Sequence, residues 1–340
     1  MSIETSFFLI WVTAPHTFEP RYMRSIESIV RHHPDARVTV LSNTLPSNFF
    51  QSHGLTSVGV EAYSLEQLTR GTPAEAWYGK RHIFNQSDFF GNHEADLLRL
   101  MTLFHRGGTY VDTDVFFVRP LRLPSGCDGG VGIESGEGGM DLAELTTSAS
   151  EPGAEMMSAA ALRVQRDAVL CNAVMSFRAG SSFLARAIWS FVHEYVPLTP
   201  GLSMLELYSR GEWGAMGPLL LTRLLLDQGE RWGANGALGG ARATRTCILR
   251  RETFYPIAPG PDAIAHFGPW DDERDAAVLT RILADGADGA PAVVAVHFWN
   301  ALTRAHPLQC GSLMHRLFER ERDPRALFQV PCYGRSPTSV

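Results

Sequence analysis

Two aspartates, Asp112 and Asp114, stand two residues apart immediately after a short apolar run at residues 109–111. If the backbone turns there instead of staying extended, both carboxylates can converge on one hard divalent cation. A cation held in this way neutralises the negative charge that develops on a diphosphate leaving group. The alternative is a solvated turn after a strand, and an Asp-x-Asp pair alone does not decide between the two.

A predicted helix precedes this pair and carries candidate residues of its own. Apolar residues recur at helical spacing across residues 94–106, and Gly107 and Gly108 supply the left-handed cap that ends such a helix. Asp96 and Arg99 lie three residues apart on one face of it. They offer a carboxylate to sugar hydroxyls and a guanidinium to a hydroxyl or phosphate oxygen. The other interpretation is an exposed intrahelical ion pair, worth about 0.2–0.5 kcal/mol.

The elements around these residues follow an α/β order. Residues 7–12 have the pattern of a strand buried on both faces, residues 20–31 form an amphipathic helix that stops at Pro34, and residues 38–41 are a second strand. This β-α-β opening is typical of nucleotide-binding, Rossmann-like sheets, which are mostly parallel. Further strands are predicted at residues 109–111, 168–177 and 292–298, and further helices at 182–195 and 218–227.

We predict one domain over residues 1–340, because no repeat and no linker-like tract of low complexity interrupts the chain. The glycine-rich stretch at residues 126–139 predicts a surface loop. Residues 141–165 and 271–289 are predicted to be peripheral insertions, the first of them partly helical.

Composition and cysteine spacing limit the possible partners and the cellular compartment. The net charge is −6 and no run of Lys or Arg is present, which argues against nucleic acid as a partner. The five cysteines are odd in number, widely spaced and without a Cys-x-x-Cys pair. They predict neither a zinc framework nor disulfides, and therefore a reducing, cytoplasmic location. The apolar run at residues 7–12 is far shorter than the roughly 20 residues of a membrane span, so no membrane anchor is expected.

Taken together, residues 95–99 and 107–114 resemble the hallmark of the Asp-x-Asp-containing sugar transferases. That group includes glycosyltransferase family 32, with its α-1,4-galactosyltransferases and α-1,4-N-acetylglucosaminyltransferases, and more distantly the clostridial toxin glucosyltransferases. The resemblance extends in order to residues 25–28, 34–38, 172–175, 217–218 and 296–300. It implies a GT-A-like fold. One departure is Ala95, where relatives often have a serine that contacts the donor.

The resemblance implies a role for each matching residue. Asp114 resembles the direct metal ligand, and Asp112 resembles the residue that meets the ribose and the metal shell. Asp96 and Arg99 resemble the pair that grips the donor sugar. His297 resembles the C-terminal contact to metal or diphosphate, and an imidazole there suits Mn²⁺ better than Mg²⁺. Two residues beside it are further candidates for donor binding: Trp299 and Asn300.

Four other candidates each have two interpretations. Trp11, at the end of the first strand, stacks on the uracil of the donor or packs in the core. Ser42 and Asn43 end the second strand, where ligands bind in open α/β sheets, or they form a turn that uses their side chains locally. Asn172 orients the sugar or the acceptor hydroxyl, or it is a buried structural amide.

The sequence therefore predicts a metal-dependent glycosyltransferase. The resemblance implies a UDP-sugar donor (UDP-galactose, UDP-GlcNAc or UDP-glucose), Mn²⁺ or Mg²⁺, and retention of the anomeric configuration. The acceptor hydroxyl belongs to a carbohydrate, lipid, small molecule or protein. A GDP-mannose-dependent mannosyltransferase and a non-catalytic sugar-binding module are the alternatives. A haloacid-dehalogenase-like phosphatase is disfavoured, because its first Asp ends the first strand, and here that strand ends without a carboxylate.

Overall fold

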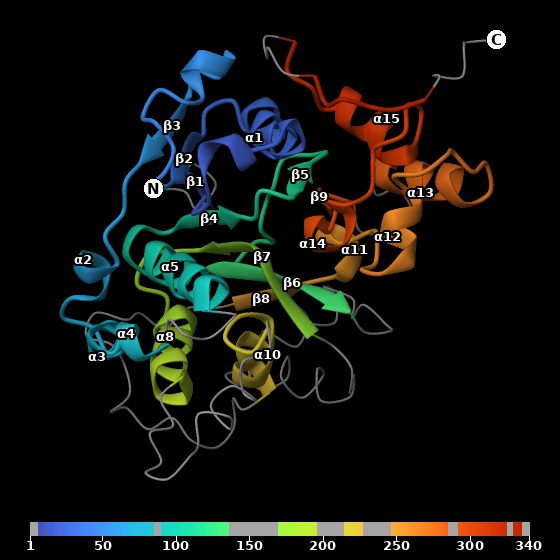
Figure 1. The fold of residues 1–340 in the computed structure, drawn as a ribbon. Coiled ribbons are helices and arrows are strands. Elements are labelled where there is room, and N and C mark those ends of the chain that lie inside the picture. Colours follow the sequence, from blue (N-terminus) through green and yellow to red (C-terminus); the bar gives the residue numbers. More distant parts are fainter. Residues whose placement is uncertain are drawn as a thin grey trace. The chain divides into compact units, whose positions relative to one another are not determined.

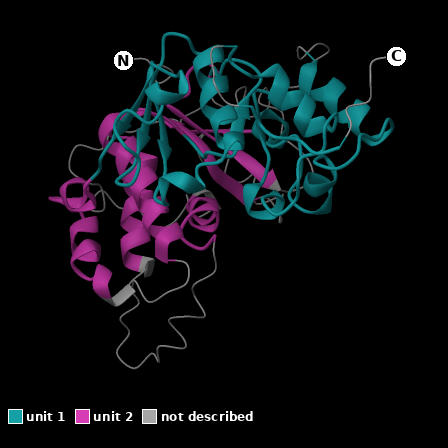
Figure 2. Ribbon diagram, turned by 45° about the horizontal axis from the view of Figure 1, so that its top comes forward, with its two compact units in different colours: residues 1–63, 111–122, 250–340 teal, residues 64–110, 123–249 magenta. Residues whose placement is uncertain are grey.

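The computed structural model describes residues 6–84, 90–135, 169–195, 214–226, 246–284, 292–324 and 329–334. The chain divides into two compact units, coloured separately in Figure 2. Unit 1 consists of residues 1–63, 111–122 and 250–340, and unit 2 consists of residues 64–110 and 123–249. The predicted insertion at residues 141–165 lies outside the described residues. The prediction of a single domain stays a prediction.

Figure 1 shows the helices and strands that the structure describes. The strands are β1 (Ser6–Ile10), β2 (Arg37–Leu41), β3 (Val58–Glu61), β4 (Gly108–Val111), β5 (Val115–Phe117), β6 (Gly129–Ser135), β7 (Val169–Phe177), β8 (Thr246–Leu249) and β9 (Ala295–His297). The longer helices are α1 (Pro20–His32), α5 (Phe90–Arg106), α8 (Ser182–Tyr195), α10 (Pro218–Leu226), α13 (Arg274–Leu283) and α15 (Leu313–Arg320). Shorter helices are α2 (Leu65–Thr69), α3 (Ala74–Gly79), α4 (Arg81–Phe84), α11 (Arg251–Phe254), α12 (Pro261–Ala265) and α14 (Asn300–Thr303), with 3-10 turns η2 (Pro15–Thr17) and η3 (Gln51–His53).

Unit 1 opens with the predicted β-α-β arrangement. β1 pairs in parallel with β2, and β2 pairs in parallel with β3. The three central residues of β1 are fully buried, as a strand covered on both faces requires. α1 begins at Pro20, whose missing N–H costs nothing at the first helical position. The predicted α/β class, with mostly parallel pairing, is confirmed.

A second, two-stranded sheet in unit 1 joins distant parts of the sequence. β5 and β9 are antiparallel, with Val115 opposite His297 and Phe117 opposite Ala295. All residues of both short strands are buried. This burial explains why β9 lies in an apolar run of the sequence. This pairing brings the residues around Asp114 to the C-terminal part of the chain.

Unit 2 contains the strand order β4-β7-β6-β8, with α5, α8 and α10 packed beside it (Figure 1). α5 ends at the predicted glycines, where Gly107 has φ 64° and its N–H donates to the Leu103 carbonyl at 2.8 Å. A Cβ on Gly107 would lie 2.7 Å from the Ala179 nitrogen, so no other residue fits there. The helix end is therefore fixed both by conformation and by packing.

The glycine-rich stretch at residues 126–139 is not a surface loop throughout, so that prediction was wrong in part. Residues Gly129–Ser135 form β6, which is antiparallel to β7 and parallel to β8. A Cβ on Gly129 would lie 2.2 Å from the Phe177 ring, and one on Gly130 would lie 2.6 Å from Leu123. Here the glycines mark close approach of neighbours inside a sheet and not a turn.

The prediction that the cysteines form no disulfides was wrong. Cys127 is bonded to Cys247 in unit 2, and Cys310 is bonded to Cys332 in unit 1, while Cys171 is buried and outside both bonds. The first pair is 120 residues apart and meets because β6 and β8 lie side by side, which no local spacing reveals. Disulfides persist mainly in oxidising compartments. The cytoplasmic location stays a prediction, and its argument from the cysteines no longer holds.

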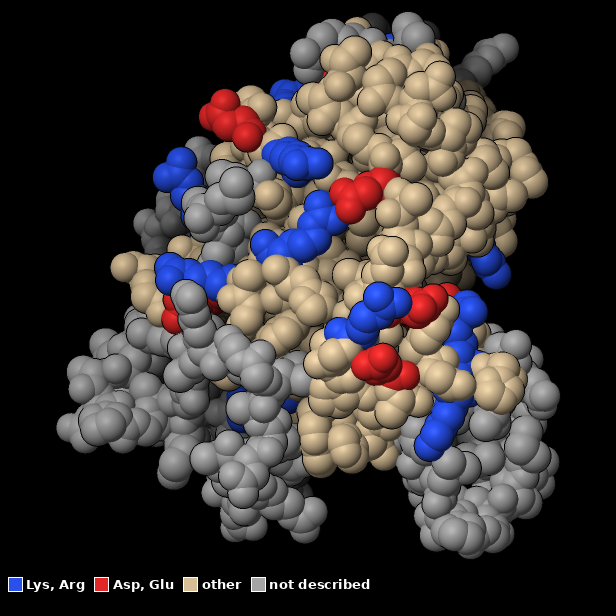
Figure 3. Space-filling view, turned by 90° about the vertical axis from the view of Figure 1, so that its left-hand side faces the viewer, with Lys and Arg blue, Asp and Glu red and all other residues tan. Residues whose placement is uncertain are grey.

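Residues 271–284 of the second predicted insertion are described, and they include α13. Asp275 in this helix is buried, and its carboxylate lies 2.7 Å from Nδ1 of His266. The part of the chain seen in the structure contains no helix with both the length and the apolarity to cross a membrane. Figure 3 shows acidic and basic side chains interspersed on one face, without a continuous basic area among the described residues.

His33, just after α1, leads to a prediction for the pH dependence of stability. Its Nε2 accepts a hydrogen bond from the Leu121 N–H at 2.8 Å, and burial lowers its pKa to about 4. An unfolded histidine takes up a proton below about pH 6.5, whereas the folded one stays neutral until about pH 4. Stability is therefore lost as the pH falls between these values, by at most about 3 kcal/mol.

His33→Gln keeps an acceptor at this position but does not titrate. The free energy of unfolding of the unchanged protein, measured with urea, should exceed that of the variant most at about pH 7. The difference should shrink by up to about 3 kcal/mol towards pH 4. A difference that stays constant with pH would contradict the assignment of this loss to His33.

Candidate functional site

The turn after β4 places the two aspartates in unit 1. The Val115 N–H donates to the Asp112 carbonyl at 3.1 Å and closes a tight turn. Ser25 in α1 donates from Oγ to the Thr113 carbonyl at 2.6 Å, which ties the turn to the helix. The backbone therefore bends between the two aspartates. Without such a bend, the two carboxylates could not both reach one cation.

β9 brings His297 beside Asp114. The Phe298 N–H donates to the Asp114 carbonyl at 3.0 Å and continues the β5–β9 pairing. Nε2 of His297 lies 3.0 Å from Oδ2 of Asp114. The Asn300 N–H, 186 residues away in sequence, donates to the same oxygen at 2.9 Å. Asp114 and His297, predicted as two of the metal ligands, thus form one cluster, in which His297 is buried and Asp114 is half-buried.

Asp112, the third predicted metal ligand, does not complete a three-ligand group with Asp114 and His297. Its side chain is half-buried in the turn. Among the described residues, no three His, Cys, Asp or Glu ligand atoms within 4.8 Å of one another include Asp112 or Asp114. The pair Asp114–His297 is therefore the part of the predicted metal site that the fold assembles directly, and the role of Asp112 at the ribose and metal shell stays a prediction.

The environment of Asp114 keeps its carboxylate ionised. Burial raises the pKa of Asp114, but the neighbouring His297 and the hydrogen bonds from His297 and the Asn300 backbone outweigh burial. The net pKa lies below the usual value. A divalent cation needs such an anionic oxygen, because hard cations prefer carboxylate ligands.

The side chain of Asn300 adds a further oxygen that can bind a metal ion. Its side-chain amide hydrogen-bonds to the hydroxyl of Tyr22. Its Oδ1 is buried and has no hydrogen-bond partner among the described atoms. Carboxylate and amide oxygens together with an imidazole nitrogen suit Mn²⁺. The residues in this cluster therefore fit the divalent cation that the sequence predicts.

Trp299 occupies a strained position next to this cluster. Its φ of 52° is left-handed, which is uncommon for any residue except glycine. The indole N–H donates to the Ile257 carbonyl at 2.9 Å, and the ring lies 3.9 Å from the imidazole of His297, centroid to centroid. Trp299 thus fixes the orientation of His297, and its predicted contact to the donor stays a prediction. Strain of this kind is concentrated at functional sites.

Trp11 lies at the end of β1 and is mostly buried. Its ring packs against Phe18 at 4.6 Å and Tyr22 at 5.2 Å between centroids. For the parts of the indole ring that Phe18 and Tyr22 cover, these contacts favour the interpretation of Trp11 as a core residue. The indole Nε1 is buried with no hydrogen-bond partner among the described atoms, so it remains available as a donor. Stacking on a base stays a prediction.

Ser42 and Asn43 serve the loop that follows β2. Ser42 Oγ accepts from the N–H groups of Thr44 at 3.2 Å and Leu45 at 3.1 Å. The Asn43 amide donates to the Tyr63 carbonyl and accepts from the Tyr63 N–H, both at 3.0 Å. The geometry supports the turn interpretation for Ser42, whereas Asn43 joins this loop to the segment that follows β3. The binding of a nucleotide by either side chain stays untested.

Unit 2 gathers the three residues predicted to hold the sugar. Nδ2 of Asn172 in β7 donates to Oδ1 of Asp96 at 2.8 Å. Arg99 lies 3.4 Å from that same oxygen and donates to the Asn172 carbonyl at 2.9 Å. Its guanidinium also lies 4.5 Å above the Tyr110 ring. All three predicted side chains are at least nine-tenths buried, so Asp96 and Arg99 are not the exposed surface pair of the alternative interpretation.

Gly217, in the Gly-Pro pair that precedes α10, packs closely against Asn172 and Asp96. A Cβ there would lie 2.4 Å from Nδ2 of Asn172 and 2.9 Å from Oδ2 of Asp96. Only a glycine therefore lets the backbone approach these two polar groups so closely. This explains physically why a Gly-Pro pair belongs to the sequence pattern.

Tyr22 is the site residue that the sequence analysis missed. It connects the Trp11 ring with the Asn300 amide, and it is buried in α1. Burial, above all, raises its pKa, so its hydroxyl stays protonated. A signal was present: Tyr22 lies three residues before Ser25, which puts both on the helix face that meets the Asp112 turn.

For Tyr22→Phe we expect about fivefold weaker activation by Mn²⁺, because the hydrogen bond that orients Asn300 is worth about 1 kcal/mol. The measurement is the Mn²⁺ concentration that gives half-maximal activity. Tyr333→Phe, which changes an exposed tyrosine of the same unit, is the control and should not shift it. If both variants match the unchanged protein, Tyr22 does not position Asn300.

Comparisons with known proteins bear on the motif that contains these residues. Residues 19–129 match the model of the family described as the glycosyltransferase sugar-binding region containing a DXD motif. This stretch includes Asp96, Arg99, Asp112 and Asp114. The resemblance predicted from the sequence is thereby confirmed: residues 19–129 are similar to the sugar-binding region of the DXD-containing glycosyltransferases.

Curated relatives extend the match over most of the chain. The chain is 26% identical over 301 residues to lactosylceramide 4-alpha-galactosyltransferase of Rattus norvegicus, covering 86% of the chain and 66% of the relative. It is 21% identical over 268 residues to human alpha-1,4-N-acetylglucosaminyltransferase, covering 74% of the chain and 63% of the relative. The chain thus spans slightly less than two thirds of the length of these relatives. Both matches support the prediction that the protein is a transferase.

Among solved structures, the PaToxG glycosyltransferase is similar at 16% sequence identity with a TM-score of 0.40. The match covers 66% of this chain and 69% of that chain.

Proposed function

We propose that this protein transfers a hexose from a UDP-sugar to an acceptor hydroxyl, with a divalent cation bound at Asp114. The observation that carries the proposal is the cluster of Asp114, His297 and Asn300, held by the β5–β9 pairing. This arrangement has a use in diphosphate chemistry, where the leaving group must be neutralised. It has none in a module that only recognises a sugar.

Asp114, His297 and the Oδ1 of Asn300 would hold Mn²⁺. When bound there, the cation supplies Lewis-acid stabilisation of the departing diphosphate. The chain's own contribution is to orient these ligands: Tyr22 holds the Asn300 amide, and Trp299 holds the imidazole. Neutral imidazole is the form that binds metal, so His297 would act as a ligand in that form.

We assign the donor sugar to Asp96, Arg99 and Asn172 in unit 2. The Asp96 carboxylate accepts from sugar hydroxyls, and Arg99 donates to a hydroxyl or phosphate oxygen. Arg99 packs on Tyr110, which precedes Asp112 by two residues in the chain. Binding energy on the sugar contributes to turnover only where it is stronger in the transition state than in the ground state.

We further propose that transfer retains the anomeric configuration and that the acceptor is a carbohydrate hydroxyl, free or lipid-linked. The support is the sequence relationship to two α-1,4-glycosyltransferases. We assign no protein nucleophile. A front-face displacement, in which the leaving diphosphate takes the acceptor proton, needs none.

A panel of nucleotide sugars tests the proposal. UDP-galactose, UDP-GlcNAc, UDP-glucose and GDP-mannose are each incubated with the protein, with Mn²⁺, with Mg²⁺ or with a chelator, and release of the nucleotide is measured. We expect slow hydrolysis of one UDP-sugar that requires the cation, is faster with Mn²⁺ and stops with the chelator.

The panel also separates the alternatives. Hydrolysis of GDP-mannose alone would identify GDP-mannose as the donor in place of a UDP-sugar. It would not affect the assignment of the metal site. Saturable binding of a nucleotide sugar without any turnover, with or without a carbohydrate acceptor, would favour the non-catalytic module. Turnover that a chelator does not affect would overturn the role assigned to Asp114.

A further inference from the structure

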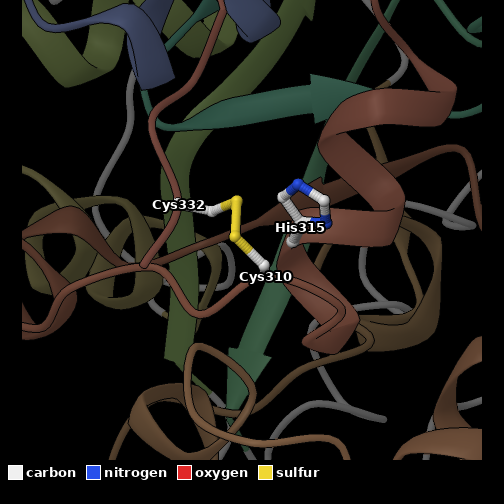
Figure 4. A group of neighbouring side chains, drawn as sticks. All are labelled: Cys310, His315 and Cys332. Carbon is white, nitrogen blue, oxygen red and sulfur yellow. A yellow bond between two sulfur atoms is a disulfide. The ribbon is translucent and has the colours of Figure 1, made fainter. Parts of the chain in front are cut away.

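A second group of metal-binding side chains lies in unit 1, far along the sequence from Asp114. Cys310, Cys332 and His315 place their ligand atoms within 4.8 Å of one another, as Figure 4 shows for their side chains. His315 is in the first turn of α15, and the two cysteines form a disulfide. Within the residues that the structure describes, this is the one group of three such side chains. All three are half-buried, so small solutes can reach them.

The backbone holds the two cysteines together independently of their sulfur–sulfur bond. The Cys310 N–H donates to the Tyr333 carbonyl at 3.0 Å, and the Tyr333 N–H donates to the Leu308 carbonyl at 2.8 Å. These bonds form an isolated parallel bridge between Gln309 and Tyr333. Reduction of the disulfide would therefore leave two thiols that remain close to each other.

His315 is also fixed from several sides. Ser312 Oγ caps α15 by accepting from the His315 N–H at 3.1 Å. The Gly311 N–H donates to Nδ1 of the imidazole at 3.1 Å, and Arg316 Nε donates to the Gly311 carbonyl at 3.0 Å. Buried apolar residues anchor the helix to the core: Leu313, Met314, Leu317 and Phe318. The imidazole is thus presented to the sulfurs by a well-supported helix end.

We propose that Cys310, Cys332 and His315 form a Zn²⁺ site once their disulfide is reduced. The reductant, a dithiol in the cell, supplies two electrons and two protons, is itself oxidised to a disulfide, and leaves two protein thiols. Zn²⁺ then binds both sulfurs as thiolates, and the two thiol protons are released. The imidazole gives up its hydrogen bond with Gly311 and binds as a neutral ligand, and water takes the fourth position.

The donor set separates this site from the cluster at Asp114. Two thiolates and one imidazole favour Zn²⁺ and related soft or borderline ions. Carboxylate and amide oxygens favour Mn²⁺ or Mg²⁺. The Cys310 site is closed while the disulfide is intact, so occupancy depends on the redox state of the surroundings. The inference does not rest on the proposed transferase activity.

Cobalt(II) is a suitable probe, because a thiolate-bound Co²⁺ absorbs strongly through charge transfer, whereas Co²⁺ at oxygen and nitrogen ligands does not. The full-length chain carrying Cys127→Ser and Cys247→Ser is reduced with a trialkylphosphine, which is oxidised to its phosphine oxide and carries no competing thiol. The protein is then titrated anaerobically with Co²⁺, and afterwards with Zn²⁺ to displace it. An oxidised sample of the same chain is titrated in parallel.

We expect the charge-transfer band in the reduced protein at one Co²⁺ per chain, its loss on addition of Zn²⁺, and no band in the oxidised protein. His315→Ala should weaken binding by about tenfold or more, the range seen when support of a metal site is removed. His306→Ala, a half-buried histidine of the same segment, is the matched control and should bind as before. Both cysteines stay in these variants. Each variant can therefore fold with the Cys310–Cys332 disulfide formed, before it is reduced for the titration.

Two results would overturn the site. One is a reduced, folded chain without the charge-transfer band. The other is equal Co²⁺ affinity in His315→Ala, His306→Ala and the parent, which would show that the imidazole is not a ligand. If the Cys127→Ser, Cys247→Ser background fails to fold, the titration is repeated with the natural cysteines. The band must then persist in Cys127→Ser alone and vanish in Cys332→Ser alone.

Discussion

Asp114→Asn should abolish sugar transfer, with a fall of roughly a thousandfold, because Lewis-acid stabilisation of the leaving group is worth several kcal/mol and each 1.36 kcal/mol is tenfold in rate. The amide keeps the size of the carboxylate and can still accept from the Asn300 N–H, which the carboxylate accepts at 2.9 Å. It lacks the negative charge that a divalent cation needs. The measurement is turnover of the nucleotide sugar at saturating Mn²⁺, with a thermal melt to show that the fold is kept.

Asp262→Asn is the matched control, because it removes an exposed carboxylate from the same unit. It should leave both turnover and the response to Mn²⁺ unchanged. If Asp114→Asn retained near-normal activity at saturating Mn²⁺, the carboxylate would not be a metal ligand, and the cluster with His297 would have a structural role only.

Asp96→Ala should reduce kcat/KM for the nucleotide sugar by about a hundredfold while UDP binds within about twofold of normal. The reason is that the carboxylate is assigned to the sugar, and UDP carries none. UDP affinity is measured by calorimetry and turnover by nucleotide release. Glu94→Ala, on the same helix but paired with Arg81 at the surface, is the control.

Asp96 also accepts from Asn172 and neighbours the buried Arg99, so its removal carries a cost in stability. Asp96→Asn keeps the side-chain volume and an acceptor oxygen, and it should show the same split between turnover and UDP affinity. A parallel loss of UDP affinity and activity in this variant would place Asp96 at the diphosphate or in a structural role instead.

The parts of the fold that the sequence predicted are those with strong local signals. The β-α-β opening could be read from a double-sided apolar strand and a helix that begins at Pro20. The end of α5 could be read from two glycines that both adopt positive φ. In each case the residue type is dictated by its own backbone conformation or burial, so sequence and structure agree.

The features that the sequence could not predict depend on contacts between distant segments. Cys127 meets Cys247 because β6 lies beside β8, and the glycines of β6 look like loop residues until Phe177 is seen packed against them. The side chain of Asn43 bonds to the backbone of Tyr63, which lies twenty residues further along the chain. No local pattern distinguishes these outcomes, since spacing in sequence carries no record of tertiary neighbours.

The candidate site was predictable in its residue types but not in its assembly. The motif and the resemblance named Asp114 and His297 as candidates, yet only the register of β5 with β9 shows that they touch. Only the structure shows that Asp112 does not complete a three-ligand group with them. Tyr22 and the strained backbone of Trp299 became visible only in three dimensions, because both act by orienting another residue.

Binding of Mn²⁺, followed by the electron paramagnetic resonance signal of the free ion, is the most direct test of the metal centre. Protein and Mn²⁺ are mixed with and without UDP, for the unchanged chain, Asp114→Asn, His297→Ala and the control Asp262→Asn. We expect UDP to draw one Mn²⁺ per chain out of the free pool in the unchanged protein and the control, and in neither site variant. Equal uptake by all four proteins, or no uptake by the unchanged protein with UDP, would contradict this expectation.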